Sequence, residues 1–172
     1  MSRIIKTVAH NNYDGTWRIE TSHGDEILID EEDLDLVMRY SFSVNGRGYA
    51  HAHINGKCIT IQRYILGITD PDVTIDHING DKLDNRRANL RVCTRQQNCC
   101  NRGIGSNNRS GCTGVSMRKN GKFIARIVHA GKENWLGTFA TFDEAVNARI
   151  AGEIEHFGIY RRDAMITCGS VN

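Results

Sequence analysis

Residues 74–101 read TIDHINGDKLDNRRANLRVCTRQQNCCN, and this stretch decides the fold of the chain. Residues 73–76 alternate between apolar and polar side chains, which predicts a short strand, and an Asn-Gly pair just after it predicts a turn. Residues 89–93 alternate again and predict a second strand. Residues 94–97 then have the Thr-x-x-Gln pattern of a helix capping box. We therefore expect two strands packed against one helix.

Four polar residues of this stretch are candidates for a catalytic site: Asp76, His77, Asn89 and Asn98. A one-metal phosphodiester hydrolase needs oxygen donors for a hard cation, an imidazole that takes a proton from water, and an amide that orients the imidazole. The first strand delivers Asp76 and His77 to its end, and Asn98 falls in the first turns of the helix. Asp76 and Asn98 are thus expected to face each other across the strand-helix cleft, and the sequence predicts a nuclease.

The segment DHINGDKLDNRRANLR and the QN that follows it closely resemble the HNH endonucleases, which share a ββα-metal fold. The resemblance implies that Asp76 and the side-chain oxygen of Asn98 hold one divalent metal, with His77 as general base. It also implies that Asn89 fixes the imidazole, and that the products carry a 5′-phosphate and a 3′-hydroxyl. Because the implied ligands are hard oxygen donors, Mg²⁺ is the expected metal and Mn²⁺ a substitute.

The region from residue 110 onward has a different pattern. It predicts three strands at 113–118, 122–129 and 133–138, with turns at Asn-Gly and Ala-Gly pairs between them. A helix should follow, because residues 141–144 form another capping box and small residues recur at helical spacing. Gly158 is expected to end that helix.

This arrangement resembles the Apetala-type DNA-binding domain of plant ethylene-response factors, through its GV, GKF-A-I and WLGTF motifs and its EA-A helix. The resemblance implies that the sheet lies in the major groove. The matching positions are Arg118, Lys122, Arg126, Trp135 and Thr138. Strand alternation places Lys122, Ile124 and Arg126 on one face. Phe123, Ala125 and Ile127 lie on the other face, which we expect to be core. For Trp135, packing within the sheet stays open as an alternative. Arg149 departs from the family, whose members commonly have an aromatic residue there.

Charge is distributed unevenly along the chain. The net charge is only +2, but no Asp or Glu occurs between residues 86 and 132, and seven lie between residues 25 and 35. The block contains eleven basic residues: Arg86, Arg87, Arg91, Arg95, Arg102, Arg109, Arg118, Lys119, Lys122, Arg126 and Lys132. A polyanion partner explains this block better than a solvated surface does, so we expect Arg86, Arg87, Arg91 and Arg95 to contact DNA. The acidic stretch should face away from the DNA.

Arg63 is a further candidate for a phosphate contact. In many HNH relatives a His precedes the corresponding Arg, whereas this chain has Gln62. A surface arginine beside an apolar run is an equally good interpretation. Asp81 and Asp84 are expected in turns and in salt bridges to the neighbouring arginines.

The first sixty residues are predicted to contain strands at 16–20 and 26–29, a helix from Asp30 to about Tyr40, and a hairpin over 41–54. A packing scaffold is the default role for this segment. The predicted organisation is modular: a lead-in module (1–60), the nuclease core (61–101), a flexible linker (102–111), the Apetala-type domain (112–160) and a tail (161–172).

The predicted fold class is α+β, as a small modular protein in which a ββα-metal nuclease core precedes a three-stranded antiparallel sheet packed on one helix. The predicted function is a site-specific DNA endonuclease of the homing or phage type, acting on double-stranded DNA as a monomer or as a dimer on a palindromic site. A non-cleaving DNA-binding or regulatory protein is the alternative, and an RNA-binding module is less favoured because exposed aromatic platforms are scarce.

The sequence has no transmembrane run or signal peptide, so a cytoplasmic protein without membrane contact is expected. Its six cysteines are then predicted to be free thiols. A structural zinc is the less favoured alternative, because no C-x-x-C pair occurs.

Overall fold

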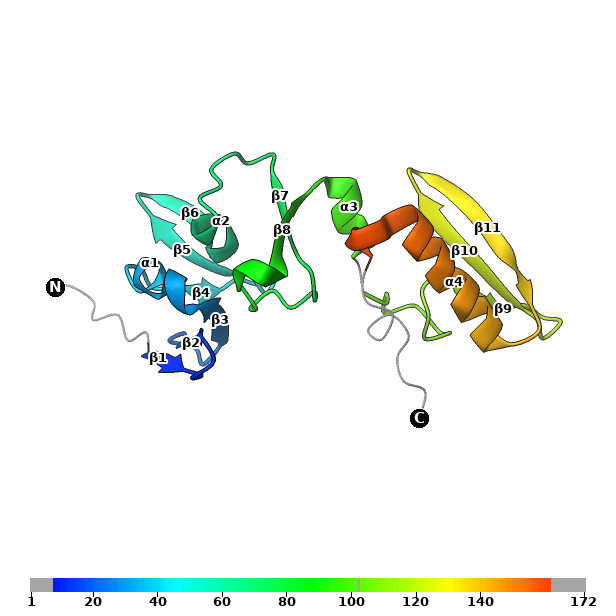
Figure 1. Cartoon of the computed structure of the whole chain (residues 1–172), viewed down its shortest axis with the longest axis horizontal. Helices are drawn as coiled ribbons and strands as arrows, with labels where there is room; N and C mark the ends of the chain where they lie inside the picture. Colours follow the sequence, from blue (N-terminus) through cyan, green and yellow to red (C-terminus); the bar gives the residue numbers. More distant parts are fainter. Residues whose placement is uncertain (1–7, 102, 162–172) are drawn as a thin grey trace. The chain divides into compact units, whose positions relative to one another are not determined.

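A computed structural model describes residues 8–101 and 103–161 of the chain. Two compact units make up the protein, Met1–Cys93 and Thr94–Asn172 (Figure 1). Helices and small antiparallel sheets occur in both, which confirms the predicted α+β class. Arg102, Cys168 and most of the predicted tail lie outside the described residues. Among the described residues, no helix is both long and apolar enough to cross a lipid bilayer.

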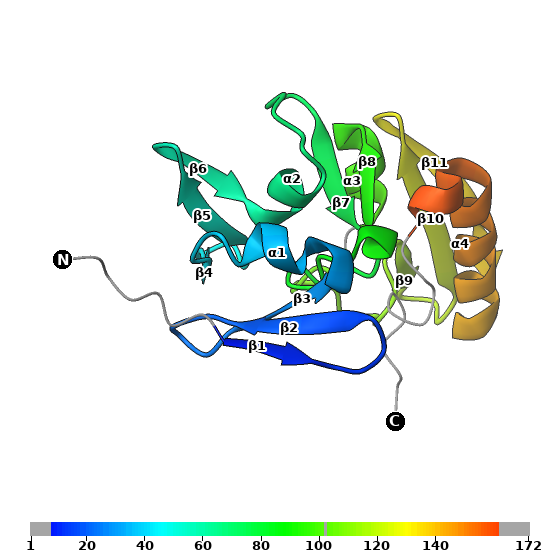
Figure 2. The same cartoon turned by 60° about the vertical axis from the view of Figure 1, so that its left-hand side comes forward.

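The first unit begins with two antiparallel sheets. One contains β1 (Val8–Asn11), β2 (Thr16–Glu20) and β3 (Glu26–Asp30), and the other contains β4 (Ser43–Val44), β5 (Ala50–Ile54) and β6 (Lys57–Thr60) (Figure 2). A 3-10 turn (Glu31–Asp33) and the short helix α1 (Leu34–Val37) connect them. The strands at 16–20 and 26–29 were predicted, whereas β1 and β6 were not, and the predicted helix from Asp30 to Tyr40 is much shorter than expected.

The second half of the first unit carries the predicted hairpin of the nuclease core. Helix α2 (Ile61–Ile65) precedes β7 (Thr74–His77) and β8 (Leu90–Cys93), which pair in antiparallel fashion. A long loop joins the two strands and ends in a 3-10 turn, Arg87–Asn89. Both predicted strands and the turn after the first of them are therefore confirmed.

The first unit has one hydrophobic core, to which both of its halves contribute. Ile19 and Ile27 come from the first sheet, Ile61 and Ile65 from α2, and Leu90 from β8, and all five are buried. Backbone hydrogen bonds join β3 to the loop between β7 and β8. The predicted boundary at residue 60 therefore divides a single core. The physical reason is that a two-stranded hairpin buries too little apolar surface to fold alone.

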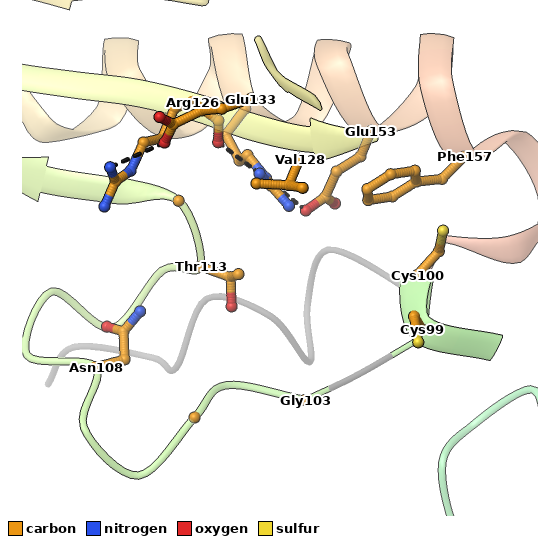
Figure 3. Close-up of a pocket in the computed structure, with 13 residues that line it drawn as sticks. Cys99, Cys100, Gly103, Asn108, Thr113, Arg126, Val128, Glu133, Glu153 and Phe157 are labelled. Atoms are coloured by element: carbon orange, nitrogen blue, oxygen red, sulfur yellow. Dashed lines mark hydrogen bonds and ion pairs between the residues drawn. The ribbon is translucent and has the colours of Figure 1, made fainter. Parts of the chain in front are cut away.

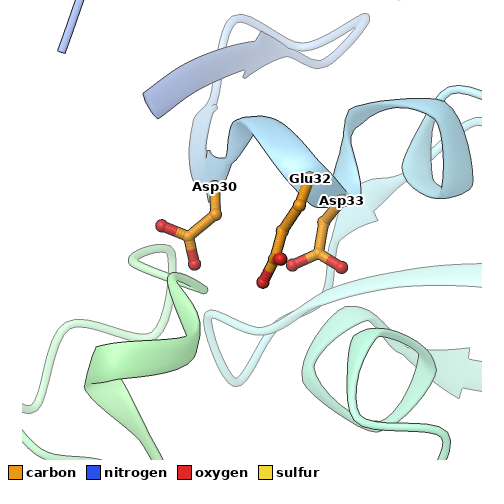
Figure 4. A group of neighbouring side chains, drawn as sticks. All are labelled: Asp30, Glu32 and Asp33. Carbon is orange, nitrogen blue, oxygen red and sulfur yellow. The ribbon is translucent and has the colours of Figure 1, made fainter. Parts of the chain in front are cut away.

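Arg87 ties the two halves of this unit together electrostatically, through the acidic group that Figure 4 shows. Asp30, Glu32 and Asp33 bring their carboxylates within 4.8 Å of one another. The Arg87 guanidinium donates to both oxygens of Asp33, at 2.7 and 3.0 Å, and lies 2.8 Å from Glu32. Its backbone N–H donates to Asp30 at 2.7 Å, and Asp30 makes no side-chain capping bond to the turn that follows it. The cation that this acidic group holds is therefore Arg87, which was expected to contact DNA.

Replacing Arg87 by alanine should lower the free energy of unfolding of the first unit by about 2–3 kcal/mol, less than for a fully buried pair because the Arg87 side chain is 43% exposed. The change leaves the Asp33 carboxylate, whose side chain is 2% exposed, without its counter-ion. Urea unfolding measures the loss. Arg18→Ala is the matched control, because the 3.6 Å pair of Arg18 with Glu26 is exposed and should contribute little. Equal losses for the two variants would contradict this role of Arg87.

The second unit contains α3 (Arg95–Cys100), a sheet of β9 (Val115–Met117), β10 (Phe123–His129) and β11 (Lys132–Phe139), and helix α4 (Phe142–Phe157). The sheet is antiparallel with order β11-β10-β9, and α4 packs on one of its faces (Figure 1). The predicted strands, both capping boxes and the helix end at Gly158 are confirmed. The core between sheet and helix includes Val115, Ala125 and Ala145.

The predicted flexible linker is organised over its described part, 103–111. Asn108 accepts backbone hydrogen bonds from Ser110 and Gly111 at 3.0 and 2.9 Å, and donates to the carbonyl of Cys112 at 2.9 Å. Ser110 donates to the carbonyl of Val115 at 2.6 Å. These polar residues indicated flexibility in the sequence, but short Asn and Ser side chains also close turns by bonding to the nearby backbone.

Candidate active site

Asp76 and His77 occupy the last two positions of β7 and are both buried, with 7% and 4% of their surfaces exposed. They pair across the hairpin with Arg91 and Leu90 of β8. The chain turns immediately afterwards, because the backbone N–H of Gly80 donates to the carbonyl of His77 at 2.9 Å. Gly80 has a φ of 78°, a left-handed conformation that favours glycine. The strand end and this turn therefore fix the position of the Asp-His pair.

The imidazole of His77 is held by Asn85, a fully buried residue of the loop between β7 and β8. His77 Nε2 lies 3.1 Å from Asn85 Oδ1, and Asn85 Nδ2 donates to the carbonyl of Lys82 at 3.3 Å. The second bond directs the amide oxygen of Asn85 towards the ring. His77 Nε2 therefore carries the hydrogen, and the lone pair of the neutral imidazole is on Nδ1.

Asn89 has a different role from the one predicted for it. Its Nδ2 donates to the carbonyl of Asp84 at 2.7 Å, and its Oδ1 accepts the backbone N–H of Asn79 at 3.0 Å. Asn89 was expected to orient the imidazole, but the residue that hydrogen-bonds to the ring in the structure is Asn85. Both ends of the Asn89 amide hold the loop, since the residue lies in the turn that leads into β8.

Burial lowers the pKa of His77 below its usual value of 6.5, although the hydrogen bond that His77 donates to Asn85 and the nearby carboxylates of Asp76, Asp81 and Asp84 act in the opposite direction. The net effect favours the neutral ring at pH 7. Tyr49 packs beside it, with 6.0 Å between the two ring centroids. His77 is thus arranged as a neutral, oriented proton acceptor.

The metal-free protein provides a test of this pKa. A ¹H–¹⁵N NMR titration in EDTA should place the pKa of His77 below 6.5, and Asn85→Ala should lower it further, because the lost hydrogen bond raises the pKa. The unfolded chain then binds the proton more readily than the folded one. Folding stability should therefore fall as the pH drops below 6.5. A pKa of His77 above 6.5 would contradict the arrangement.

Asp76 forms a buried ion pair with Arg91. Its Oδ2 accepts hydrogen bonds from Arg91 Nε at 2.9 Å and from Nη2 at 2.6 Å, and the two side chains are 8% and 12% exposed. Asp76 therefore already faces positive charge at the end of β7. A hard divalent cation fits this donor chemistry, since a buried carboxylate is the type of ligand that Mg²⁺ binds. Arg91, which was expected to contact DNA, is engaged with Asp76.

Two further arginines that were predicted to contact DNA are occupied by the protein itself. Arg86 donates twice to the buried carboxylate of Asp84, at 2.8 and 2.7 Å, which confirms the expected salt bridge. Burial alone would raise the pKa of Asp84, but the hydrogen bonds from Arg86 outweigh it and the pKa is lowered. Arg63 donates to the carbonyls of Asp70 and Val73, as well as that of Pro71, and so fastens the loop before β7.

The remaining residues of the predicted nuclease site lie in the second unit. Asn98 is half-buried in α3, where its backbone N–H donates to the carbonyl of Thr94 at 2.9 Å. Arg95, in the first turn of α3, is exposed. The metal-binding role of Asn98 stays a prediction from the sequence.

The sheet of the second unit presents the predicted DNA-binding residues on its exposed side. All five are exposed: Arg118, Lys122, Arg126, Trp135 and Thr138. Trp135 is 55% exposed, with the guanidinium of Arg118 5.3 Å from its ring centroid. Arg126 pairs with Glu133 at 2.9 Å. Ala125 and Ile127 are fully buried, which confirms the predicted division of β10 into two faces.

Arg149 of α4 is buried beneath this sheet. It donates to Glu153 at 2.8 Å and to the carbonyl of Arg126 at 2.5 Å. Arg149 and Glu153 line a pocket of about 550 Å³ within the second unit, together with Gly114 and Phe157 (Figure 3). An internal ion pair of α4 thus holds the helix to β10.

None of the five described cysteines, Cys58, Cys93, Cys99, Cys100 and Cys112, forms a disulfide with another described cysteine. Their number and positions add no residue to the candidate active site. In the described residues, the one acidic group close enough to share a cation is the one that Arg87 occupies.

A buried Asp-His pair at a strand end, with an amide that orients the imidazole, defines a candidate hydrolytic centre. Residues 60–99, which include the pair, match the family model described as HNH endonuclease. The chain is also 29% identical over 115 residues to a protein of Acanthamoeba polyphaga mimivirus described as an uncharacterized HNH endonuclease. That match covers 64% of this chain and 59% of the relative. No solved structure matches the chain. These similarities support a nuclease.

Proposed function

We propose that the protein is a metal-dependent endonuclease that cuts double-stranded DNA with His77 as its general base. The observation that carries the proposal is the neutral, buried imidazole of His77, oriented by Asn85 beside the carboxylate of Asp76. The similarity of residues 60–99 to HNH endonucleases supports the same conclusion.

In the proposed reaction, Asp76 would hold the divalent cation. A bound Mg²⁺ supplies Lewis-acid stabilisation of the charge on the scissile phosphate and the leaving 3′ oxygen. His77 takes a proton from water at Nδ1 while the water oxygen attacks phosphorus in line. The bond from phosphorus to the 3′ oxygen breaks, and that oxygen takes a proton from solvent water, which leaves a 5′-phosphate and a 3′-hydroxyl. Asn85 keeps the ring oriented, and the carboxylates of Asp81 and Asp84 favour the imidazolium that forms.

The second unit is proposed to select the DNA site, as an Apetala-type domain of a homing or phage-type enzyme. Its exposed sheet face combines basic side chains with Trp135, which suits contact with phosphates and bases. A cutter linked to a separate recognition unit is then directed to a particular sequence. One active site per chain gives a nick, and two chains on a palindrome give a double-strand break.

Conversion of a supercoiled plasmid library with random inserts tests the proposed function. The protein with Mg²⁺ is expected to yield open-circle or linear DNA, whereas EDTA or Asp76→Ala should prevent conversion. The form of the product distinguishes nicking from double-strand cutting. If the protein shifts DNA on a gel but never cuts it with Mg²⁺ or Mn²⁺, the non-cleaving alternative is correct instead.

Alanine at Lys122 or at Arg118 should weaken DNA binding and reduce the salt dependence of the affinity by about one unit of slope for each phosphate contact removed. Both side chains are exposed on the proposed DNA-binding face. Fluorescence anisotropy of a labelled duplex, repeated at several salt concentrations, gives the slope. Lys57→Ala is the matched control, because Lys57 is an exposed lysine of the first unit. If Lys57→Ala changes the salt dependence of the affinity equally, the exposed sheet face is not the DNA-binding surface.

A further inference from the structure

The ion pair of Asp76 and Arg91 is built into the β7–β8 hairpin. The two residues are direct partners in the strand register, and two N–H groups of the guanidinium converge on the single oxygen Oδ2 of Asp76. Little of either side chain is exposed. The hairpin therefore supplies Asp76 with a positive charge from within the protein.

This charge has two opposite effects. Without Arg91, the buried Asp76 carboxylate would lose the positive charge of the guanidinium, which is destabilising. A divalent cation that binds Asp76, however, meets the guanidinium at the same carboxylate, and two cations repel each other at such short range. The arginine that stabilises the metal-free hairpin must therefore oppose the binding of a metal there.

We propose that Arg91 is a resident competitor for the metal site, which neutralises Asp76 until a divalent cation displaces it. The inference rests on the proposed function, since it takes Asp76 as the metal ligand. Once displaced from Asp76, the planar guanidinium can bind phosphate oxygens in bidentate fashion. Arg91 thus pairs with Asp76 in the metal-free protein and contacts a DNA phosphate in the metal-bound protein.

The competing interpretation is that Arg91 only orients Asp76 for the metal. The two interpretations predict opposite signs. If Arg91 competes, Arg91→Met lowers stability in EDTA and raises the affinity for the cation. If Arg91 only orients the carboxylate, the same change lowers both the stability and the affinity.

A Mn²⁺ titration of the full chain without DNA, followed by electron paramagnetic resonance, measures the affinity, and thermal unfolding in EDTA measures the stability. Arg91→Met is expected to bind Mn²⁺ about tenfold more tightly than the unmodified protein and to unfold at a lower temperature. Arg91→Lys keeps the charge but loses the two-bond contact of the guanidinium. Its Mn²⁺ affinity should therefore lie between those of the unmodified protein and Arg91→Met. Asp76→Asn together with Arg91→Met should abolish the gain.

Arg86→Met is the matched control, because Arg86 makes a similar two-bond contact to Asp84 in the same hairpin loop. It should destabilise the protein without changing Mn²⁺ affinity. If Arg91→Met fails to fold, Arg91→Lys alone gives the comparison. The inference is overturned if both Arg91 variants bind Mn²⁺ no more tightly than the unmodified protein does. If that result comes with metal-dependent plasmid cleavage, the inference alone is wrong. If it comes with no cleavage by any form, the proposed function is wrong as well.

Discussion

Replacing His77 by alanine is expected to lower the rate of DNA cleavage by about 10²–10⁴-fold while DNA affinity remains unchanged. The alanine removes the group that accepts the proton of the attacking water. The side chain is almost fully buried, so it offers little surface for a contact with DNA in the ground state. Single-turnover nicking of a supercoiled plasmid measures the rate, and a gel shift in EDTA measures the affinity.

Two other variants separate catalysis from general damage to the fold. Asn85→Ala should reduce the rate less than His77→Ala does, because the imidazole remains but loses the hydrogen bond that orients it. His10→Ala should cut at the full rate, since the His10 side chain is 56% exposed on β1. Unchanged cleavage by His77→Ala would rule out His77 as the base, and an equal loss of DNA binding would assign it to binding.

Local sequence patterns predicted most of the elements that carry the site. The capping boxes at Thr94 and Thr141, the turn after His77 and the division of β10 into two faces all depend on residues within a few positions of one another. Such patterns are encoded by backbone geometry and are readable without knowledge of the rest of the fold. The strand β6 and helix α2, by contrast, lacked a clear local signal.

The partners of the site residues could not be predicted in this way. Asn85 and Asn89 are both asparagines of one loop, and only the path of that loop decides which of them reaches the imidazole. Arg87 was assigned to DNA from its place in a basic block, but its partner Asp33 lies 54 residues earlier in the chain. A charge block records which residues are basic, whereas ion pairs depend on tertiary contacts. The only sequence feature that could have pointed to Asn85 was its position directly after Asp84.

Alanine at Gly114 is expected to destabilise the second unit by about 3 kcal/mol or more. Gly114 has a φ of 78°, and a Cβ there would lie 2.3 Å from the carbonyl oxygen of Arg126 and 2.6 Å from Nη1 of Arg149. That carbonyl accepts the hydrogen bond from Arg149, so the methyl group would force apart the backbone of β10 and the buried ion pair. The sheet that carries the proposed DNA-binding face should therefore unfold before the first unit does.

Gly121→Ala isolates the effect of the clash from that of the backbone conformation. Gly121 has a φ of 76°, but a Cβ there would meet open space, so its cost should be about 1 kcal/mol, the penalty of the left-handed conformation alone. The chain has two tryptophans, and Trp17→Phe leaves the fluorescence of Trp135 as the reporter of the second unit during urea unfolding. The Gly114 variant should lose DNA affinity in proportion to the unfolded fraction of this unit. If Gly114→Ala and Gly121→Ala lower the free energy of unfolding equally, α4 and β10 move apart freely. The contact between Arg149 and Arg126 then does not hold the sheet in place.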